Sequence, residues 1–237
     1  GTGKPEHHDR YHLLDFKPPE EPYGAGEFVR LARVILEEAF PAGRSVVVVG
    51  GTGLYIRALF EEYADLSPLP PPELRAELTA LPLCELVSRL REQAPDLAAR
   101  TDLGNPVRVS RALERLAAPP VERFTLPPFR KLKIALDPPD LPERVRSRVR
   151  QMLDSGWREE VASLTDRGVS LDAPAFRAIG YRDVATGNYG TLEEAVVSLT
   201  LRYAKRQRTW LRSEPNLRCF SDASAAILAV REWIAAH

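Results

Sequence analysis

The sequence predicts an α/β fold with parallel strands, and three observations lead to this prediction. The four consecutive valines Val46–Val49 are typical of a parallel strand that is covered on both faces. A glycine-rich turn, Gly50-Gly51-Thr52-Gly53, follows the valines directly and leads into an apolar helix. Apolar residues at helical spacing precede the valines, which completes a helix–strand–helix order of the α/β type.

The first elements can be bounded from the same patterns. A helix is expected over Gly26–Ala39, where Phe28, Leu31 and Ile35 recur near the helical period. The strand Val46–Val49 follows, and a second helix is expected over Leu54–Glu61.

A proline-rich stretch at Ser67–Pro72 then changes the character of the chain. Short, charged, amphipathic helices are expected after it, over Glu73–Ala80, Leu83–Gln93 and Val107–Leu116. Asn105-Pro106 is a start signal for the last of these helices. We therefore expect residues 67–126 to form a helical insert in an α/β core made of residues 1–66 and 127–237.

A return strand is expected at Leu132–Leu136 after the insert. Three helices follow it in the prediction, over Pro142–Asp154, Arg158–Asp166 and Leu192–Arg212. Gly156 is placed to cap the first of these helices, because glycine adopts the left-handed conformation that ends many helices.

The composition excludes some functional classes. No apolar run approaches the roughly 20 residues that cross a bilayer, and the start does not look like a signal peptide. The two cysteines, Cys84 and Cys219, lie far apart in the sequence, which favours a reducing cytoplasm over a disulfide scaffold. We therefore expect a cytoplasmic protein without a membrane partner. A monomer is the default expectation.

The net charge is zero, with 33 basic and 33 acidic residues, but the charge is unevenly distributed. Between Ala195 and Ser213 every charged residue is basic, namely Arg202, Lys205, Arg206, Arg208 and Arg212. On a helix, Arg202, Lys205 or Arg206, Thr209 and Arg212 share one face, which we call the basic stripe. Taken by itself, the stripe is more typical of a solvated helix face than of a nucleic-acid contact.

The glycine turn also allows two interpretations. Glycines let the backbone approach a ligand, and the amides of the following helix then favour an anion. A tight strand-to-helix turn needs the same glycines. Thr52 could position a substrate, or its hydroxyl could cap the next helix.

Three blocks carry a resemblance to a known family, Val49–Tyr55, Arg177–Arg182 and Tyr203–Arg212. In this order, with a helical insert between the first two, the chain resembles bacterial tRNA dimethylallyltransferases. These enzymes attach a five-carbon prenyl group to N6 of the adenosine just 3′ of the tRNA anticodon. Further similar segments are Gly1-Thr2-Gly3-Lys4-Pro5, Leu66–Pro70, Arg108–Glu114 and Arg148–Gly156.

The resemblance implies a P-loop NTPase-like core of the nucleotide-binding type. It also implies dimethylallyl diphosphate as prenyl donor, Mg²⁺ as cofactor and the tRNA anticodon stem-loop as acceptor, with no obligate protein partner. Thr52 and Arg148 match the catalytic residues, and Gly51, Thr52, Gly53 and Arg148 match the diphosphate site. Spacing alone does not select Arg148, because arginines alternate along Arg144–Arg150 and most such residues face solvent.

The resemblance also implies a set of tRNA contacts. They are Arg177, Gly180, Tyr181, Arg182, Lys205, Arg206, Gln207, Trp210 and Arg212, with Arg75, Arg108 and Arg111 in the insert. Trp210 could stack on a base or anchor its helix, and its leucine neighbours favour anchoring. Val107 and Ala117–Pro120 depart from the family pattern, and the second departure weakens the assignment of RNA contacts to the insert.

In the family, a strand, a P-loop and a catalytic aspartate precede the segment that Gly1–Pro5 resembles, so we expect them outside this sequence. Gly1-Thr2-Gly3-Lys4 is not the P-loop, because Pro5 stands where Ser or Thr would hold magnesium. No metal ligand is assigned within the chain, and His7, His8 and His12 are expected to be loop residues rather than ligands.

Three other functions are compatible with parts of the pattern. A related adenylate isopentenyltransferase would act on a free nucleotide, which gives the basic stripe no purpose. A non-catalytic tRNA-binding protein would need neither P-loop nor base. A kinase of similar core architecture is the weakest alternative, because fold alone does not fix function.

Overall fold

The computed structural model describes residues 10–61, 70–118, 128–187 and 191–236. These residues form two compact units. The first takes its described residues from Gly1–Tyr23, Gly43–Ile56 and Pro127–His237, and the second from Gly24–Ala42 and Arg57–Leu126. Outside the described residues lie His7, His8, the segment Gly1–Pro5 and residues 67–69 of the proline-rich stretch.

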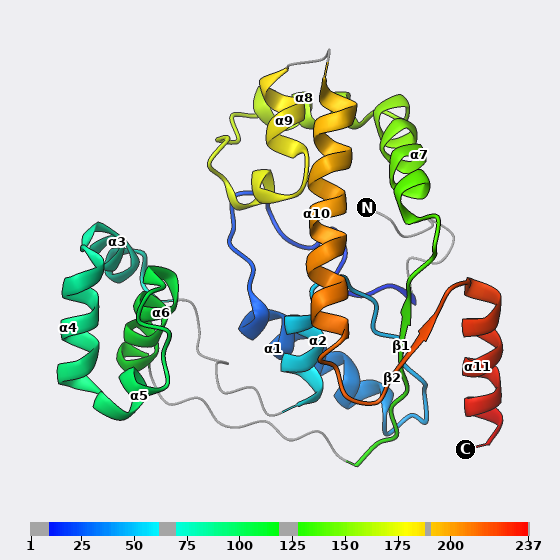
Figure 1. The fold of residues 1–237 in the computed structure, drawn as a ribbon, viewed down its shortest axis with the longest axis horizontal. Coiled ribbons are helices and arrows are strands. Elements are labelled where there is room, and N and C mark those ends of the chain that lie inside the picture. Colours follow the sequence, from blue (N-terminus) through cyan, green and yellow to red (C-terminus); the bar gives the residue numbers. More distant parts are fainter. Residues whose placement is uncertain (1–9, 62–69, 119–127, 188–190, 237) are drawn as a thin grey trace. The chain divides into compact units, whose positions relative to one another are not determined.

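Helices dominate the structure (Figure 1). Before the return strand they are α1 (Ala25–Ala39), α2 (Gly53–Phe60), α3 (Pro72–Ala80), α4 (Leu83–Gln93), α5 (Pro95–Ala99) and α6 (Pro106–Ala117). After it come α7 (Leu141–Asp154), α8 (Trp157–Asp166), the 3-10 helix η2 (Pro174–Arg177), α9 (Tyr181–Thr186), α10 (Leu192–Leu211) and α11 (Ala223–Ala235). The helices predicted from periodicity are confirmed to within a few residues at each end.

The described sheet consists of two parallel strands, β1 (Lys133–Leu136) and β2 (Leu217–Phe220). Lys133 pairs with Leu217 and Leu136 with Phe220. Helix α11 packs against both strands, and Figure 1 shows it beside them. The predicted return strand is confirmed, and so is the parallel α/β class.

The predicted strand Val46–Val49 is wrong for the described structure. These residues are not paired into a sheet, and Val47 and Val49 are 83% and 88% exposed. Four β-branched residues favour extended backbone, but a strand also needs a neighbour that accepts and donates hydrogen bonds. Of the described strands, β1 and β2 pair with each other and not with this segment.

Helices α3 to α6 form a bundle with a core of its own. Leu86, Leu90 and Val109 are almost completely buried there, and Leu78 and Leu113 pack beside them. Asn105 begins α6 as expected, because its side chain accepts hydrogen bonds from the amides of Val107 and Arg108 at 3.1 and 3.2 Å. These helices therefore have the packing that a helical insert requires.

The second core joins α7, α8, α9 and α10. Its buried residues are Val145, Val149, Trp157, Val161, Val169, Ala173, Phe176, Val184, Leu192, Val196 and Val197. Gly156 separates α7 from α8 with a φ of +91°, so the predicted glycine cap is confirmed. This core holds the N-terminal half of α10 and leaves its C-terminal half to contact other parts of the unit.

Candidate functional site

The C-terminal half of α10 contacts the glycine turn. Tyr203, Gln207 and Trp210 follow one another at spacings of four and three residues, which places them on one face of the helix. Each of them lies against a different part of Gly51-Thr52-Gly53. The first and third sequence blocks are therefore neighbours in space.

Gln207 holds the backbone of the turn. Its Nε2 donates a hydrogen bond of 2.8 Å to the carbonyl oxygen of Gly51. A Cβ atom on Gly51 would lie 2.5 Å from that nitrogen and 2.7 Å from the Tyr203 hydroxyl oxygen. A side chain at position 51 would therefore displace the ends of the Gln207 and Tyr203 side chains from the turn.

Trp210 packs on the next glycine. A Cβ atom on Gly53 would lie 2.2 Å from its indole ring. The ring is half-buried, so it anchors α10 against the turn, which is the role that its leucine neighbours favoured. A contact between Trp210 and tRNA stays a prediction.

Thr52 is exposed and sits directly before α2. Its carbonyl oxygen accepts a hydrogen bond of 2.9 Å from the Tyr55 amide, which closes the first turn of the helix. Its hydroxyl oxygen lies 3.3 Å from the hydroxyl oxygen of Tyr203. Two hydroxyls from distant parts of the chain thus meet at an exposed glycine turn.

Tyr203 was missed by the assignment of site residues. Its ring also lies beneath the guanidinium of Arg206, whose Cζ is 5.6 Å from the ring centroid. The signal that could have found it is the spacing of Tyr203, Gln207 and Trp210, which share one helical face within the block that resembles the family.

The alternating arginines of α7 differ in their partners. Arg144 pairs with Asp140 at 2.8 Å, Arg146 with Glu194 at 2.6 Å and Arg150 with Glu193 at 2.9 Å. Arg148 is exposed and has no partner among the residues that the structure describes. Of these four guanidinium groups, it is the one left for an anion from outside the described chain.

The cations of the basic stripe also differ from their neighbour Arg208 in whether they form an ion pair. Arg202, Lys205 and Arg212 are exposed and form no ion pair within the described ranges. Arg208 instead pairs with Asp137 at 2.7 Å, just after β1, and so ties α10 to the sheet. The charges of the stripe are available to a ligand, whereas that of Arg208 is neutralised inside the unit.

The block Arg177–Arg182 connects η2 to α9. Gly180 has a φ of +84°, and a Cβ atom there would lie 2.5 Å from the Trp157 ring, so both backbone conformation and packing require glycine. Arg182 pairs with Asp172 at 2.7 Å, while Arg177 is exposed without a described partner. The tRNA contacts predicted for this block remain predictions.

Tyr181 is engaged within the same block. Its hydroxyl donates a hydrogen bond of 2.7 Å to Glu160, and its ring meets Trp157 edge to face. Burial, together with the hydrogen bond to the Glu160 carboxylate, raises the pKa of Tyr181 to about 12. The side chain therefore stays protonated, and its hydroxyl is occupied as a donor.

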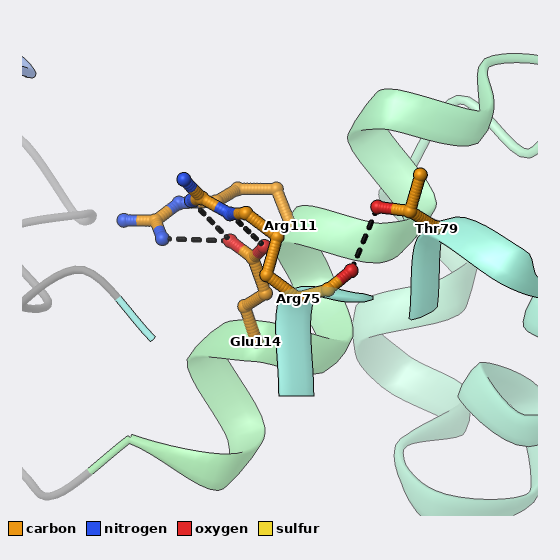
Figure 2. A network of polar contacts seen from close by, with 4 residues as sticks. All are labelled: Arg75, Thr79, Arg111 and Glu114. Carbon is orange, nitrogen blue, oxygen red and sulfur yellow. Dashed lines mark hydrogen bonds and ion pairs between the residues drawn. The ribbon is translucent and has the colours of Figure 1, made fainter. Parts of the chain in front are cut away.

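The arginines predicted to bind tRNA from the insert have partners. Arg75 and Arg111 both contact the carboxylate of Glu114, at 3.2 and 2.9 Å, as Figure 2 shows. Glu114 is 6% exposed, so the two guanidinium groups compensate a buried charge. Arg108 pairs at the surface with Asp102 at 3.2 Å. Binding of tRNA by these three arginines stays a prediction.

Two kinds of feature are absent from the described residues. No group of three or more His, Cys, Asp or Glu side chains in those ranges could hold a metal ion. No helix in the same residues is long and apolar enough to cross a membrane.

Comparison with known proteins gives consistent matches. The model of the family described as IPP transferase matches residues 1–214. The tRNA dimethylallyltransferase of Syntrophobacter fumaroxidans is 36% identical over 254 residues, which cover 98% of this chain and 74% of that protein. The tRNA dimethylallyltransferase of Halorhodospira halophila is 38% identical over 243 residues, which cover 91% of this chain and 77% of that protein.

A solved structure agrees with these matches. The crystal structure of the full-length tRNA isopentenylpyrophosphate transferase from Bacillus halodurans superposes with a TM-score of 0.63 at 30% identity. The similarity covers 95% of this chain and 77% of that one.

Proposed function

The chain belongs to the IPP transferase family, and from this premise we propose that it is a tRNA dimethylallyltransferase. The reaction transfers a dimethylallyl group from dimethylallyl diphosphate to N6 of the adenosine 3′-adjacent to the anticodon. A carbon–oxygen bond of the donor breaks, diphosphate leaves, a carbon–nitrogen bond forms and the adenine amine loses a proton.

One observation supports the assignment of the site, namely the packing of the glycine turn against α10. Gln207 fixes the carbonyl of Gly51, and Trp210 packs on Gly53, so the backbone of the turn is pre-formed. Thr52 remains exposed between them with a hydroxyl donor. A diphosphate can approach such a backbone closely, and pre-organised donors stabilise the charge that develops as it leaves.

Arg148 is proposed as a cation for the same leaving group. Its guanidinium has no described partner, whereas Arg146 and Arg150 are paired with acidic residues of α10. An arginine can bind phosphate oxygens through two parallel hydrogen bonds, and these strengthen as negative charge accumulates on the leaving group.

The unpaired cations of α10 support the RNA part of the proposal. Arg202, Lys205 and Arg212 share a helix with the residues that hold the glycine turn. An anticodon stem bound through its phosphates would therefore be held by the same helix that shapes the donor site. The target adenine has to leave its stack to reach that site.

Magnesium and the catalytic base are not assigned to residues of this chain. Mg²⁺ prefers oxygen ligands, and the described residues contain no cluster of carboxylates that could hold it. No residue of this chain is therefore given a role as a magnesium ligand. The two cysteines are free and exposed, which supports a reducing compartment such as the cytoplasm.

The test uses the complete product of the gene, including any coding sequence that precedes Gly1, with dimethylallyl diphosphate and Mg²⁺. An anticodon stem-loop with adenosine 3′ of the anticodon should gain the mass of one dimethylallyl group, and the same RNA with guanosine there should not. A competition between AMP and the stem-loop distinguishes the two enzyme classes, because an adenylate isopentenyltransferase would prenylate AMP in preference to the RNA. An RNA that is bound but unchanged in mass would contradict the proposal and favour a binding protein.

A further inference from the structure

We propose that Tyr203 is a positioning residue that fixes the Thr52 hydroxyl as a hydrogen-bond donor to the diphosphate of the prenyl donor. The inference rests on the proposed function and deepens it, because it gives a physical means of orienting the exposed Thr52 hydroxyl. It adds to the site a residue that the block Tyr203–Arg212 contains but to which no role was assigned.

The geometry places the Tyr203 hydroxyl where it can serve this purpose. It lies 3.3 Å from the Thr52 hydroxyl oxygen, and close enough to Gly51 that a Cβ atom there would be 2.7 Å away. Gln207, one helical turn further along α10, holds the Gly51 carbonyl at 2.8 Å. The distance between the two hydroxyls is thus set by a helix that is anchored on both sides of Thr52.

The ring of Tyr203 is restrained as well. The Arg206 guanidinium lies over it at 5.6 Å, from the same helix. A phenol has few rotatable bonds, so a ring held in this way presents its hydroxyl in a narrow range of positions. Thr52, in contrast, is exposed, and a threonine hydroxyl rotates to suit its partner.

The direction of the hydrogen bond follows from the chemistry of the ligand. Diphosphate oxygens are acceptors, so a Thr52 hydroxyl that binds the diphosphate has to donate its one O–H hydrogen bond to it. The bond between the two hydroxyls can then exist only if Tyr203 donates and Thr52 accepts. In this arrangement Thr52 receives one bond and gives one, which fixes its orientation and strengthens the outgoing bond.

The experiment is a double-mutant cycle of Tyr203→Phe and Thr52→Val in the complete gene product. Turnover with the anticodon stem-loop and binding of inorganic pyrophosphate without RNA are both measured. Tyr203→Phe keeps the ring under Arg206 and removes one hydroxyl, so kcat should fall by about threefold to tenfold with little change in the donor KM. In the Thr52→Val background the same change should have no effect on turnover or on pyrophosphate binding.

Tyr55→Phe is the matched control, because it removes a tyrosine hydroxyl near the same turn whose contact is the Tyr23 carbonyl rather than Thr52. It should keep the wild-type rates. Independent, multiplicative effects of Tyr203→Phe and Thr52→Val would overturn the inference, as would a Tyr203→Phe enzyme with wild-type kcat. If the wild type transfers no prenyl group, the proposed function fails, and the pyrophosphate cycle alone decides the role of Tyr203. Absence of pyrophosphate binding to the wild type would overturn the inference too.

Discussion

Gln207 donates a hydrogen bond of 2.8 Å to the carbonyl oxygen of Gly51 and so joins two residues that are 156 positions apart. The same helical face brings Tyr203 to Thr52 and Trp210 to Gly53. The shape of the glycine turn therefore depends on α10, and damage to either side of this contact should affect both stability and activity.

Replacing Gly53 by alanine should damage this contact. The new Cβ atom would lie 2.2 Å from the Trp210 ring, so the turn or the helix has to move, at a cost of about 1–3 kcal/mol. Thermal unfolding and prenyl transfer are the measurements, and both should be reduced. Gly50→Ala is the control, because its nearest neighbour would be Ile56 Cδ1 at 3.8 Å. Equal stability of the two variants would contradict the packing argument.

Replacing Arg148 by glutamine should slow prenyl transfer without changing stability. The proposed interaction is a charged hydrogen bond to the leaving group, and its loss corresponds to a decrease in kcat of roughly tenfold to a hundredfold. Arg146→Gln is the matched control from the same helix, since its guanidinium pairs with Glu194 at the surface. Steady-state kinetics decide between them, and similar losses in both variants would count against a specific role for Arg148.

The basic stripe should determine the salt dependence of tRNA binding. Each phosphate contact contributes about 0.7–0.9 to the slope of log K against log salt. The slope is negative, and replacing Arg202, Lys205 and Arg212 by glutamine should make it shallower by about two units. Titration at several salt concentrations measures this change. Arg208→Gln removes one positive charge from the same helix at a position paired with Asp137, and it should leave the slope nearly unchanged. A single stripe variant such as Lys205→Gln should instead reduce its magnitude by about 0.7–0.9. A triple variant with the wild-type slope would exclude the stripe from the RNA interface.

Replacing Glu114 by glutamine should destabilise the bundle α3–α6. The carboxylate is buried and accepts from both Arg75 and Arg111, so its loss should cost about 1–3 kcal/mol. Glu77→Gln breaks an exposed pair with Arg89 and should cost less than about 1 kcal/mol. Chemical unfolding of both variants tests this difference. A Glu114→Gln protein as stable as the wild type would show that the two arginines need no internal counter-charge.

The raised pKa of Tyr181 predicts a loss of stability at high pH. The unfolded chain releases the phenolic proton near the ordinary value of 10.0, whereas the folded protein retains it up to about 12. The stabilisation is therefore complete below pH 10 and is lost as the pH rises towards 12. The free energy of unfolding, measured across this pH window, should decline less for Tyr181→Phe than for the wild type. A Tyr181→Phe protein that loses as much stability over this window as the wild type would contradict this explanation.

Local sequence patterns predicted most of the helices, because their apolar faces and end signals are local. The sequence did not predict β2 or α11, since Leu217–Phe220 is short and carries no clear alternation of apolar residues. Asp222, whose side chain accepts from the Ala225 amide at 2.8 Å, was the available start signal for α11. The strand prediction for Val46–Val49 was wrong for the opposite reason. The local preference of these valines for extended backbone is strong, but a strand also needs a pairing partner, which only the tertiary structure determines.

The site shows the same division between local and tertiary information. The glycine turn and the basic stripe are visible in sequence, since each occupies consecutive turns of one segment. The difference between Arg148 and its neighbours Arg146 and Arg150 is not visible in the sequence, because it depends on ion pairs with Glu193 and Glu194 of another helix. Tyr203 is an intermediate case, in which helical spacing marks the right face but only the fold shows that Thr52 lies opposite.

The separation of Gly51 and Gln207 in sequence also has a consequence for the order of folding. The bundle α3–α6 is made of residues between them and depends on interactions among near neighbours, which form quickly. Closing the turn onto α10 has to overcome the entropy of the whole intervening loop. A nascent chain that ends before α10 can thus bury the bundle core while its glycine turn still lacks a partner. The proposed diphosphate site is then among the last features to form during synthesis.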